Sequence, residues 1–166
     1  MTKVWFAAWG STFPVAAVVL ILSGGAAWAK PEEATVVILT QVACQFLESE
    51  NGVDHHFKSA KKADCEAINR QTGKARLSRA KLLTLKAGKY IFQVANKNVP
   101  YELGFWLRSK GYDWLNPLHK LTKMSVSGAG LLTGKSRDYA VTLKPGEYIY
   151  SCPLNTTPDY SLVVTE

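Results

Sequence analysis

The fold is decided by the stretch Gly146-Glu147-Tyr148-Ile149-Tyr150-Ser151-Cys152-Pro153. Successive side chains of a strand point to opposite faces, so Tyr148, Tyr150 and Cys152 are predicted to share one face. A loop follows Cys152, and the chain closes with Ser161-Leu162-Val163-Val164-Thr165, which is typical of a further strand. The sequence therefore predicts a cysteine at the corner where a strand ends and a loop begins.

Similar short runs of β-branched or alternating apolar residues recur along the chain, separated by glycine and proline turns. This pattern predicts an antiparallel β-sandwich. The predicted strands upstream are residues 34–42, 82–86, 89–96, 102–108, 124–127 and 139–143. The first of them is a continuous β-branched run, so we expect it to be buried on both faces or nearly so.

Two segments interrupt the strands and are interpreted as insertions, residues 47–81 and 109–123. Within the first, residues 59–70 are predicted to form a helix that is capped by Ser59 and ends at Gly73. The second carries Trp114 and several leucines, and we expect it to fold onto the sandwich, although an apolar loop can also serve as a docking surface. The fold class is thus all-β with a short helical insertion after the first strand.

The N-terminal residues 1–29 are predicted to be a secretory signal peptide. Lys3 supplies a positive charge, an apolar stretch follows, and Ala27-Trp28-Ala29 matches the small residues of a cleavage site. A retained membrane anchor is the alternative, because the apolar stretch is nearly long enough to span a bilayer. We therefore expect export to the periplasm and one domain over residues 30–166.

The chain is basic, with 20 Lys and Arg residues against 13 Asp and Glu residues and a net charge of +7. A basic surface favours an acidic protein partner or an anionic membrane. A protein partner is expected at the Trp114 loop or at the basic insertion, residues 47–81, and a membrane only if the N-terminal segment is retained. No nucleic-acid motif is present in the sequence, and none of the usual catalytic motifs is, so we do not expect an enzyme.

Several motifs resemble the cupredoxin-like domain of the EfeO type, a periplasmic component of bacterial ferrous-iron uptake. They are Ala43-Cys44, Leu83-Thr84-Leu85-Lys86-Ala87-Gly88-Lys89, Glu102, and Leu143-Lys144-Pro145-Gly146-Glu147-Tyr148 followed by Cys152. The resemblance covers most of residues 35–164 apart from the two insertions. It implies a cupredoxin-like Greek-key β-sandwich, here as a stand-alone module without the helical domain of full EfeO proteins.

The resemblance also implies a transition-metal site, with Cys44, Cys152 and Glu102 as ligands for copper or iron. His56 is the expected fourth ligand, and His55 and Glu48 are weaker candidates. Thiolate and imidazole suit copper, while a carboxylate widens the choice to iron.

An ordinary blue-copper centre is not expected, because such a centre needs two imidazoles beside the thiolate. At the place of the first imidazole the chain offers Tyr101. At the place of the second, after Cys152, it offers Asn155, Thr156 and Thr157.

The chain has three cysteines, and an exported protein tends to oxidise them to disulfides. Pairing of Cys44 with Cys152, as a disulfide or as a reduced ligand pair, is preferred. Pairing of Cys44 with Cys65 is the alternative and would leave Cys152 free. The predicted function is a periplasmic metal carrier or electron-transfer module in iron or copper handling. The alternative is a metal-free structural or interaction module with a disulfide, as an accessory subunit of a membrane or redox complex.

Overall fold

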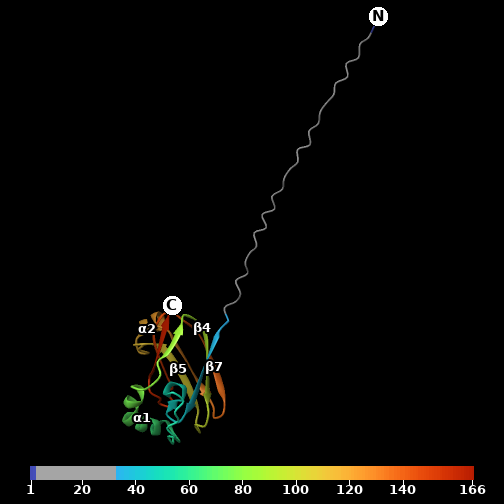
Figure 1. Ribbon diagram of the computed structural model, residues 1–166. Helices are drawn as coiled ribbons and strands as arrows, with labels where there is room; N and C mark the ends of the chain where they lie inside the picture. Colours follow the sequence, from blue (N-terminus) through green and yellow to red (C-terminus); the bar gives the residue numbers. More distant parts are fainter. Residues whose placement is uncertain (3–32) are drawn as a thin grey trace. The chain divides into compact units, whose positions relative to one another are not determined.

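The computed structural model describes residues 1–2 and 33–166, whose strands form two sheets (Figure 1). In chain order the elements are β1 Thr35–Val42, β2 Gln45–Phe46, the 3-10 turn η1 Glu48–Glu50, α1 Lys62–Leu77, β3 Leu83–Lys86, β4 Gly88–Asn96, β5 Leu103–Ser109, α2 Pro117–Thr122, β6 Ser125–Leu131, β7 Ser136–Leu143, β8 Gly146–Ser151 and β9 Tyr160–Thr165. The predicted all-β fold with a short helical insertion is confirmed. The predicted signal peptide falls almost wholly outside the described residues and stays a prediction.

The strand order is β2-β1-β4-β7 in one sheet and β3-β9-β8-β5-β6 in the other. The prediction of a purely antiparallel sandwich is wrong for two pairs, because β1 runs parallel to β4 and β3 runs parallel to β9. Parallel neighbours need a crossover connection. Between β1 and β4 that connection is long and contains β2, α1 and β3.

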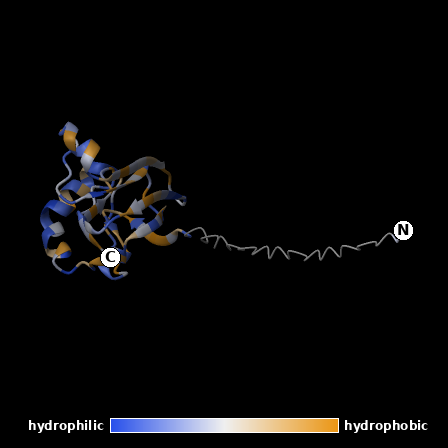
Figure 2. Cartoon of the chain, turned by 90° about the horizontal axis from the view of Figure 1, so that it is seen from above, coloured by the Kyte–Doolittle hydropathy of each residue, from blue (hydrophilic) through white to orange (hydrophobic). Residues whose placement is uncertain are grey.

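The core lies between the two sheets and is rich in aromatic rings. Phe46 meets Phe105, Tyr150 and Tyr160 edge to face, with ring centroids 6.2, 5.8 and 5.9 Å away. Phe92 stacks on Phe105 from the facing sheet at 5.6 Å. Hydrophobic and hydrophilic residues are interleaved along the sandwich (Figure 2), as expected of strands that bury one face.

Strand β1 is buried over only part of its surface, so the expectation of burial on both faces is wrong. Leu39 and Val42 are buried, whereas Val36 and Ile38 are exposed. The short β2 pairs with the last residues of β1 alone, and within residues 33–166 no second layer covers the face that carries Val36 and Ile38. The β-branched run therefore reflects strand propensity as well as burial.

Helix α1 starts and ends later than predicted. Lys61 rather than Ser59 is its N-cap, and the Asp64 carboxylate in the first turn reaches back to accept from the backbone N–H groups of Ala60 and Lys61 at 2.8 and 3.1 Å. Gly73 does not end the helix but lies buried inside it, where a Cβ would come within ordinary contact distance of Pro158. A side chain as small as alanine would therefore also fit there, and the packing of α1 beside Pro158 does not require glycine.

The second insertion does not fold onto the sandwich, contrary to the expectation. Its apolar side chains Trp114, Leu115, Leu118 and Leu121 are exposed. Its short helix α2 has its own N-cap, because the Asn116 side chain accepts from the Leu118 N–H at 3.0 Å. No helix among the described residues has both the length and the apolar character needed to cross a membrane.

Candidate functional site

The predicted cysteine corner exists, and it places Cys152 deep inside one end of the sandwich. Strand β8 ends at Ser151, and Cys152 is fully buried just beyond it. Its thiol accepts from the backbone N–H groups of Gly104 and Asn155 at 3.4 and 3.3 Å. Burial raises the pKa of the Cys152 thiol, and these N–H groups offset that rise only in part. Cys152 is therefore a neutral thiol near pH 7.

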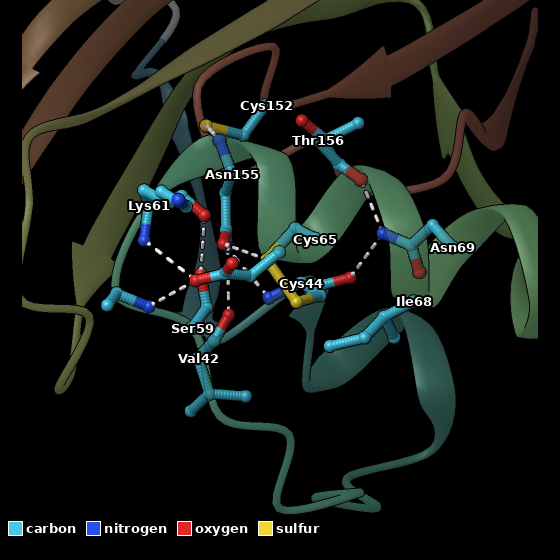
Figure 3. The surroundings of a disulfide bond; sticks show 12 residues. Val42, Cys44, Ser59, Lys61, Cys65, Ile68, Asn69, Cys152, Asn155 and Thr156 are labelled. Atoms are coloured by element: carbon cyan, nitrogen blue, oxygen red, sulfur yellow. Dashed lines mark hydrogen bonds between the residues drawn. A yellow bond between two sulfur atoms is a disulfide. The ribbon is translucent and has the colours of Figure 1, made fainter.

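Cys44 forms a disulfide with Cys65, so the preferred pairing of Cys44 with Cys152 is corrected (Figure 3). The Cα atoms of the pair are 4.9 Å apart, which is a normal disulfide separation. Cys44 lies in the turn between β1 and β2, and Cys65 lies in the first turn of α1, facing it. The Asn155 side chain lies between the disulfide and Cys152, which is the physical reason why Cys152 is left free.

Asn155 connects every part of this end of the sandwich and is fully buried. Its Oδ1 accepts from the Cys44 N–H at 2.9 Å and lies 3.4 Å from the Cys65 sulfur. Its Nδ2 donates to the Val42 carbonyl at 2.8 Å and to the Gln41 side-chain oxygen at 3.3 Å. The oxygen and the nitrogen of the Asn155 side chain are thus both used in hydrogen bonds to residues 41–44.

Tyr101 lies beside Asn155, at the place where the resemblance puts the first imidazole. Its hydroxyl is 2.6 Å from the Ser59 hydroxyl, 3.5 Å from the Asn155 Oδ1 and 3.6 Å from the Cys65 sulfur. Burial raises the pKa of Tyr101, and the Ser59 hydrogen bond lowers it by less. The phenol is therefore protonated at neutral pH and is a poor metal ligand in that form.

Gln41 completes the buried network, and the sequence reasoning missed it. Its Nε2 donates to the Gly104 carbonyl at 2.8 Å, while its Oε1 accepts from Asn155. The signal for it was a glutamine inside an otherwise apolar strand, because a buried polar side chain there must find partners. The backbone of Gly104 therefore contacts both Cys152 and Gln41.

Helix α1 covers the disulfide and the loop after Cys152. Asn69 donates through Nδ2 to the carbonyls of both Cys44 and Thr156. Arg76 adds a bond from Nη2 to the Cys44 carbonyl at 3.0 Å. Cys44 and Thr156 have left-handed φ angles of 65° and 42°, which turn these carbonyls toward the helix. The helical insertion is thus part of the structure of this site.

The structure does not bring the other predicted ligands to the cysteines. Glu102 accepts from the Gly130 N–H at 2.8 Å, and Glu48 accepts from the Thr40 N–H at 2.6 Å. His55 Nε2 lies 2.7 Å from a Glu50 carboxylate oxygen, and His56 is exposed. Within residues 1–2 and 33–166, no three His, Cys, Asp or Glu side chains are arranged to share a metal ion.

The donors around Cys152 do not match the Cys44, Cys152 and Glu102 site that the resemblance implies, because Cys44 is in a disulfide and Glu102 accepts from the Gly130 N–H. They do not match a blue-copper centre either. A blue-copper centre uses a thiolate and two imidazoles. This end of the sandwich offers a neutral thiol, the amides of Asn155 and Gln41, and the phenol of Tyr101. The arrangement is suited to hydrogen bonding and not to soft-metal ligation.

Comparisons with known proteins give a similarity of fold only. No family model matches the sequence, and no curated protein matches it. Among solved structures, auracyanin B is similar with a TM-score of 0.49 and 16% identity, over 83% of this chain and 94% of that chain. A multicopper oxidase from Pediococcus acidilactici has a TM-score of 0.40 and 11% identity, over 83% of this chain and 27% of that chain.

The multicopper oxidase Fet3p, described as functioning in iron import, has a TM-score of 0.34 and 13% identity. The match covers 95% of this chain and 37% of that chain. At these identities and scores, the similarities assign no residue role and no activity to this chain.

Proposed function

We propose that this domain is a non-enzymatic interaction module of the bacterial periplasm, built on a cupredoxin-like sandwich whose metal position has become part of the structural core. The observation that carries the proposal is the commitment of Asn155. The side chain that stands where the second imidazole is expected holds Cys44, Val42 and Gln41 by hydrogen bonds. Its role is to hold the end of β1 and the Cys44 turn, through two backbone groups and the Gln41 side chain, and both ends of the amide are used in doing so.

The state of the cysteines supports the same proposal. Cys44 is one half of a disulfide, so its sulfur is not available as a thiolate. Cys152 is neutral near pH 7 because burial raises its pKa. A copper carrier needs a soft donor set that is ready to bind, and this chain has two of its three thiols in a disulfide and the third buried.

A thiol count combined with metal analysis tests the proposal. The chain is isolated from periplasm without added reductant, and we expect one disulfide, one free thiol, and copper and iron far below one per chain. Near-equal amounts of metal and protein, with Cys44 and Cys65 reduced, would overturn it. Cys152→Ser is the matched control, because loss of that metal in the variant would locate the site at Cys152.

Copper or iron binding is the second candidate, and it requires the disulfide to be reduced. One observation favours it: all three cysteines contact Asn155, Cys44 and Cys65 from one side and Cys152 from the other. A dithiol reductant that opens the disulfide supplies two electrons and two protons and leaves thiols on Cys44 and Cys65. Reduced cysteines are donors that suit Cu(I), so the domain would then act as a metal carrier or electron-transfer module.

Titration of the reduced chain with Cu(I) against a chelator separates the two candidates. The second candidate expects binding that is lost in Cys152→Ser and weakened in Glu102→Gln, with the fold intact. Unchanged affinity in Glu102→Gln removes Glu102 from the site. No competition with the chelator at all removes the second candidate and leaves the interaction module.

A further inference from the structure

The end of the sandwich opposite Cys152 gathers several chain segments; we call it the α2 end. The register places Thr35 of β1 beside Tyr90 of β4. Gly88 of β4 pairs with Leu143 of β7, and the turn after Leu143 leads into β8. The last residue of β5, Ser109, pairs with Tyr148 near the start of β8. The start of β1, the second insertion (residues 109–123, called the α2 loop below) and the C-terminal end of β9 therefore share one end, away from α1 (Figure 1).

The α2 loop presents unpaired apolar side chains at this end. Trp114, Leu115, Leu118 and Leu121 have exposed fractions of 61%, 68%, 66% and 84%. Four exposed large apolar side chains within eight residues of one loop indicate a contact with a partner molecule or a membrane.

Hydrogen bonds within the loop hold it in this conformation. The Asp113 carboxylate accepts from the Leu115 N–H at 2.9 Å, and the Asp113 N–H donates to His119 Nδ1 at 2.9 Å. Lys123 Nζ reaches back to the Gly111 carbonyl at 2.7 Å. The loop is thus ordered by its own contacts and needs no cover from the sandwich, so its apolar side chains are pre-positioned for a partner.

Lysines surround the apolar loop at the α2 end. They are Lys86, Lys89, Lys110, Lys120, Lys123 and Lys144. Among the described residues, Lys110 is the only one of these in an ion pair, with Glu147 at 3.1 Å. Lys123 donates to the Gly111 carbonyl, so Lys86, Lys89, Lys120 and Lys144 are the ones without an ion pair or side-chain hydrogen bond among the described residues. The acidic side chains at this end are Glu33, Asp113, Glu147 and Glu166, so the six lysines exceed them by two and leave a modest positive charge.

We propose that the α2 end docks on an anionic phospholipid surface, with Trp114 and the α2 leucines entering the headgroup boundary and the lysines facing lipid phosphates. Trp114 and Leu115 lie just before α2, and Leu118, Lys120 and Leu121 lie on it; tryptophan and leucine beside lysine are typical of interfacial membrane segments. Each lysine near an anionic leaflet adds attraction. This inference rests on the proposed role as an interaction module and names its partner.

A second protein chain fits this surface less well. A stable protein interface takes about 20–30 residues from each side. The α2 loop offers four exposed apolar side chains, which is far fewer. Insertion into a bilayer needs no complementary shape, because its strength scales with the apolar area that leaves water.

Flotation of the full chain with vesicles tests the inference. One set contains phosphatidylglycerol and phosphatidylcholine in equal parts, and the other contains phosphatidylcholine alone. We expect binding to the first set that salt weakens, and at least about tenfold weaker binding for Leu118→Ser/Leu121→Ser, because less apolar area leaves water. Leu132→Ser is the matched control, since Leu132 is an exposed leucine at the opposite end.

Charge variants provide a second arm. Lys120→Glu/Lys144→Glu should weaken binding to the anionic vesicles, whereas Arg70→Glu/Lys74→Glu on α1 should leave it unchanged. Quenching by brominated lipid gives a direct reading of depth, and Trp114→Phe should lose part of the quenched fluorescence. Every variant carries the same N-terminal residues, so a difference between them belongs to the α2 end.

Three results would overturn the inference. Equal binding of the wild type and Leu118→Ser/Leu121→Ser would assign vesicle binding to another part of the chain. Absence of binding to either vesicle would leave a protein as the occupant, and a dimer that the leucine variant abolishes would assign the surface to a second copy. If the chain bound copper and also bound vesicles, the proposed function would be wrong and the membrane contact would stand. If the chain were metal-free and did not bind vesicles, the membrane contact would be wrong and the proposed function would stand.

Discussion

Asn155 holds the buried end of the sandwich because an amide both donates and accepts. Replacing it by alanine leaves the Cys44 N–H, the Val42 carbonyl and the Gln41 side chain without this partner. An unsatisfied buried polar group costs about 1–3 kcal/mol, so Asn155→Ala should lower the free energy of unfolding by about 3 kcal/mol or more. Urea denaturation followed by circular dichroism measures it.

Asn98→Ala is the control for that variant, because Asn98 is an exposed asparagine at the same end. A surface substitution of this kind should change the free energy of unfolding by less than about 0.5 kcal/mol. An equally small change in Asn155→Ala would contradict the assigned role, because the network would then be dispensable.

At the scale of elements, helix α1 is joined to the sandwich covalently as well as by packing. The Cys44–Cys65 disulfide closes a sequence separation of 21 and so restricts the unfolded chain. Cys44→Ala/Cys65→Ala should lower the free energy of unfolding by about 3 kcal/mol, as measured in urea. The amides of α1 should also exchange with solvent faster, while those of β4 change less.

Cys152→Ala is the comparison for the double variant, since it removes a buried sulfur and leaves the disulfide in place. Cys152→Ala should change the amide exchange rates of α1 only slightly, because Cys152 does not connect α1 to the sandwich. Unchanged α1 exchange in Cys44→Ala/Cys65→Ala would mean that packing and the Asn69 and Arg76 contacts hold the helix without the covalent link.

A buried ion pair joins α1 to η1 and makes the fold sensitive to acid. Arg76 Nη2 lies 2.6 Å from Glu50 Oε1, and Tyr160 and His55 also contact the Glu50 carboxylate. Burial alone would raise the pKa of Glu50, but these hydrogen bonds and the Arg76 charge hold it below its ordinary value of 4.5. A lowered folded-state pKa means stability that is present above the ordinary value and is lost as pH falls through the folded value.

Urea titrations from neutral pH into acid should therefore show a decline that starts near pH 4.5 and continues below it. Glu50→Gln should be less stable at neutral pH and should show a shallower decline. Glu147→Gln serves as the control, because the Lys110–Glu147 pair is exposed and weak. Identical pH profiles for wild type and Glu50→Gln would contradict the assigned role of Glu50.

The elements that could be predicted from the sequence are those set by local patterns. Alternation and glycine turns located β4 and β8 to within a residue or two. Gly73 was interpreted as a helix stop because glycine commonly ends helices, but α1 continues through it to Leu77. The exposure of the Trp114 loop was also missed, because a run of apolar residues does not reveal which surface, if any, covers it.

The site could be located from the sequence but not assembled. The strand pattern placed Cys152 at a corner, and the resemblance placed Tyr101 and Asn155 near it; the three do lie together. The pairing of Cys44 depends on where α1 lies, and that position is set by tertiary contacts that no sequence spacing encodes. Glu102 illustrates the same limit, because its carboxylate accepts a hydrogen bond from the Gly130 N–H and does not contact the cysteines.

At the scale of the whole molecule, the two ends of the sandwich have different structural features. The Cys152 end holds the disulfide and the buried network, and the α2 end carries the exposed apolar loop. The nine residues of β4 span about 30 Å between them at about 3.3 Å per residue. Substitutions that far apart, without shared partners, are expected to act additively.

The last prediction combines Cys44→Ala/Cys65→Ala with Leu118→Ser/Leu121→Ser. Leu118 and Leu121 are exposed, so their replacement should change the free energy of unfolding by less than about 0.5 kcal/mol. The combined variant should thus unfold in urea like the cysteine variant and bind vesicles like the leucine variant. If the cysteine variant alone lost vesicle binding while still folded, the two ends would be coupled through the sandwich, because no residue of the disulfide reaches the α2 loop directly.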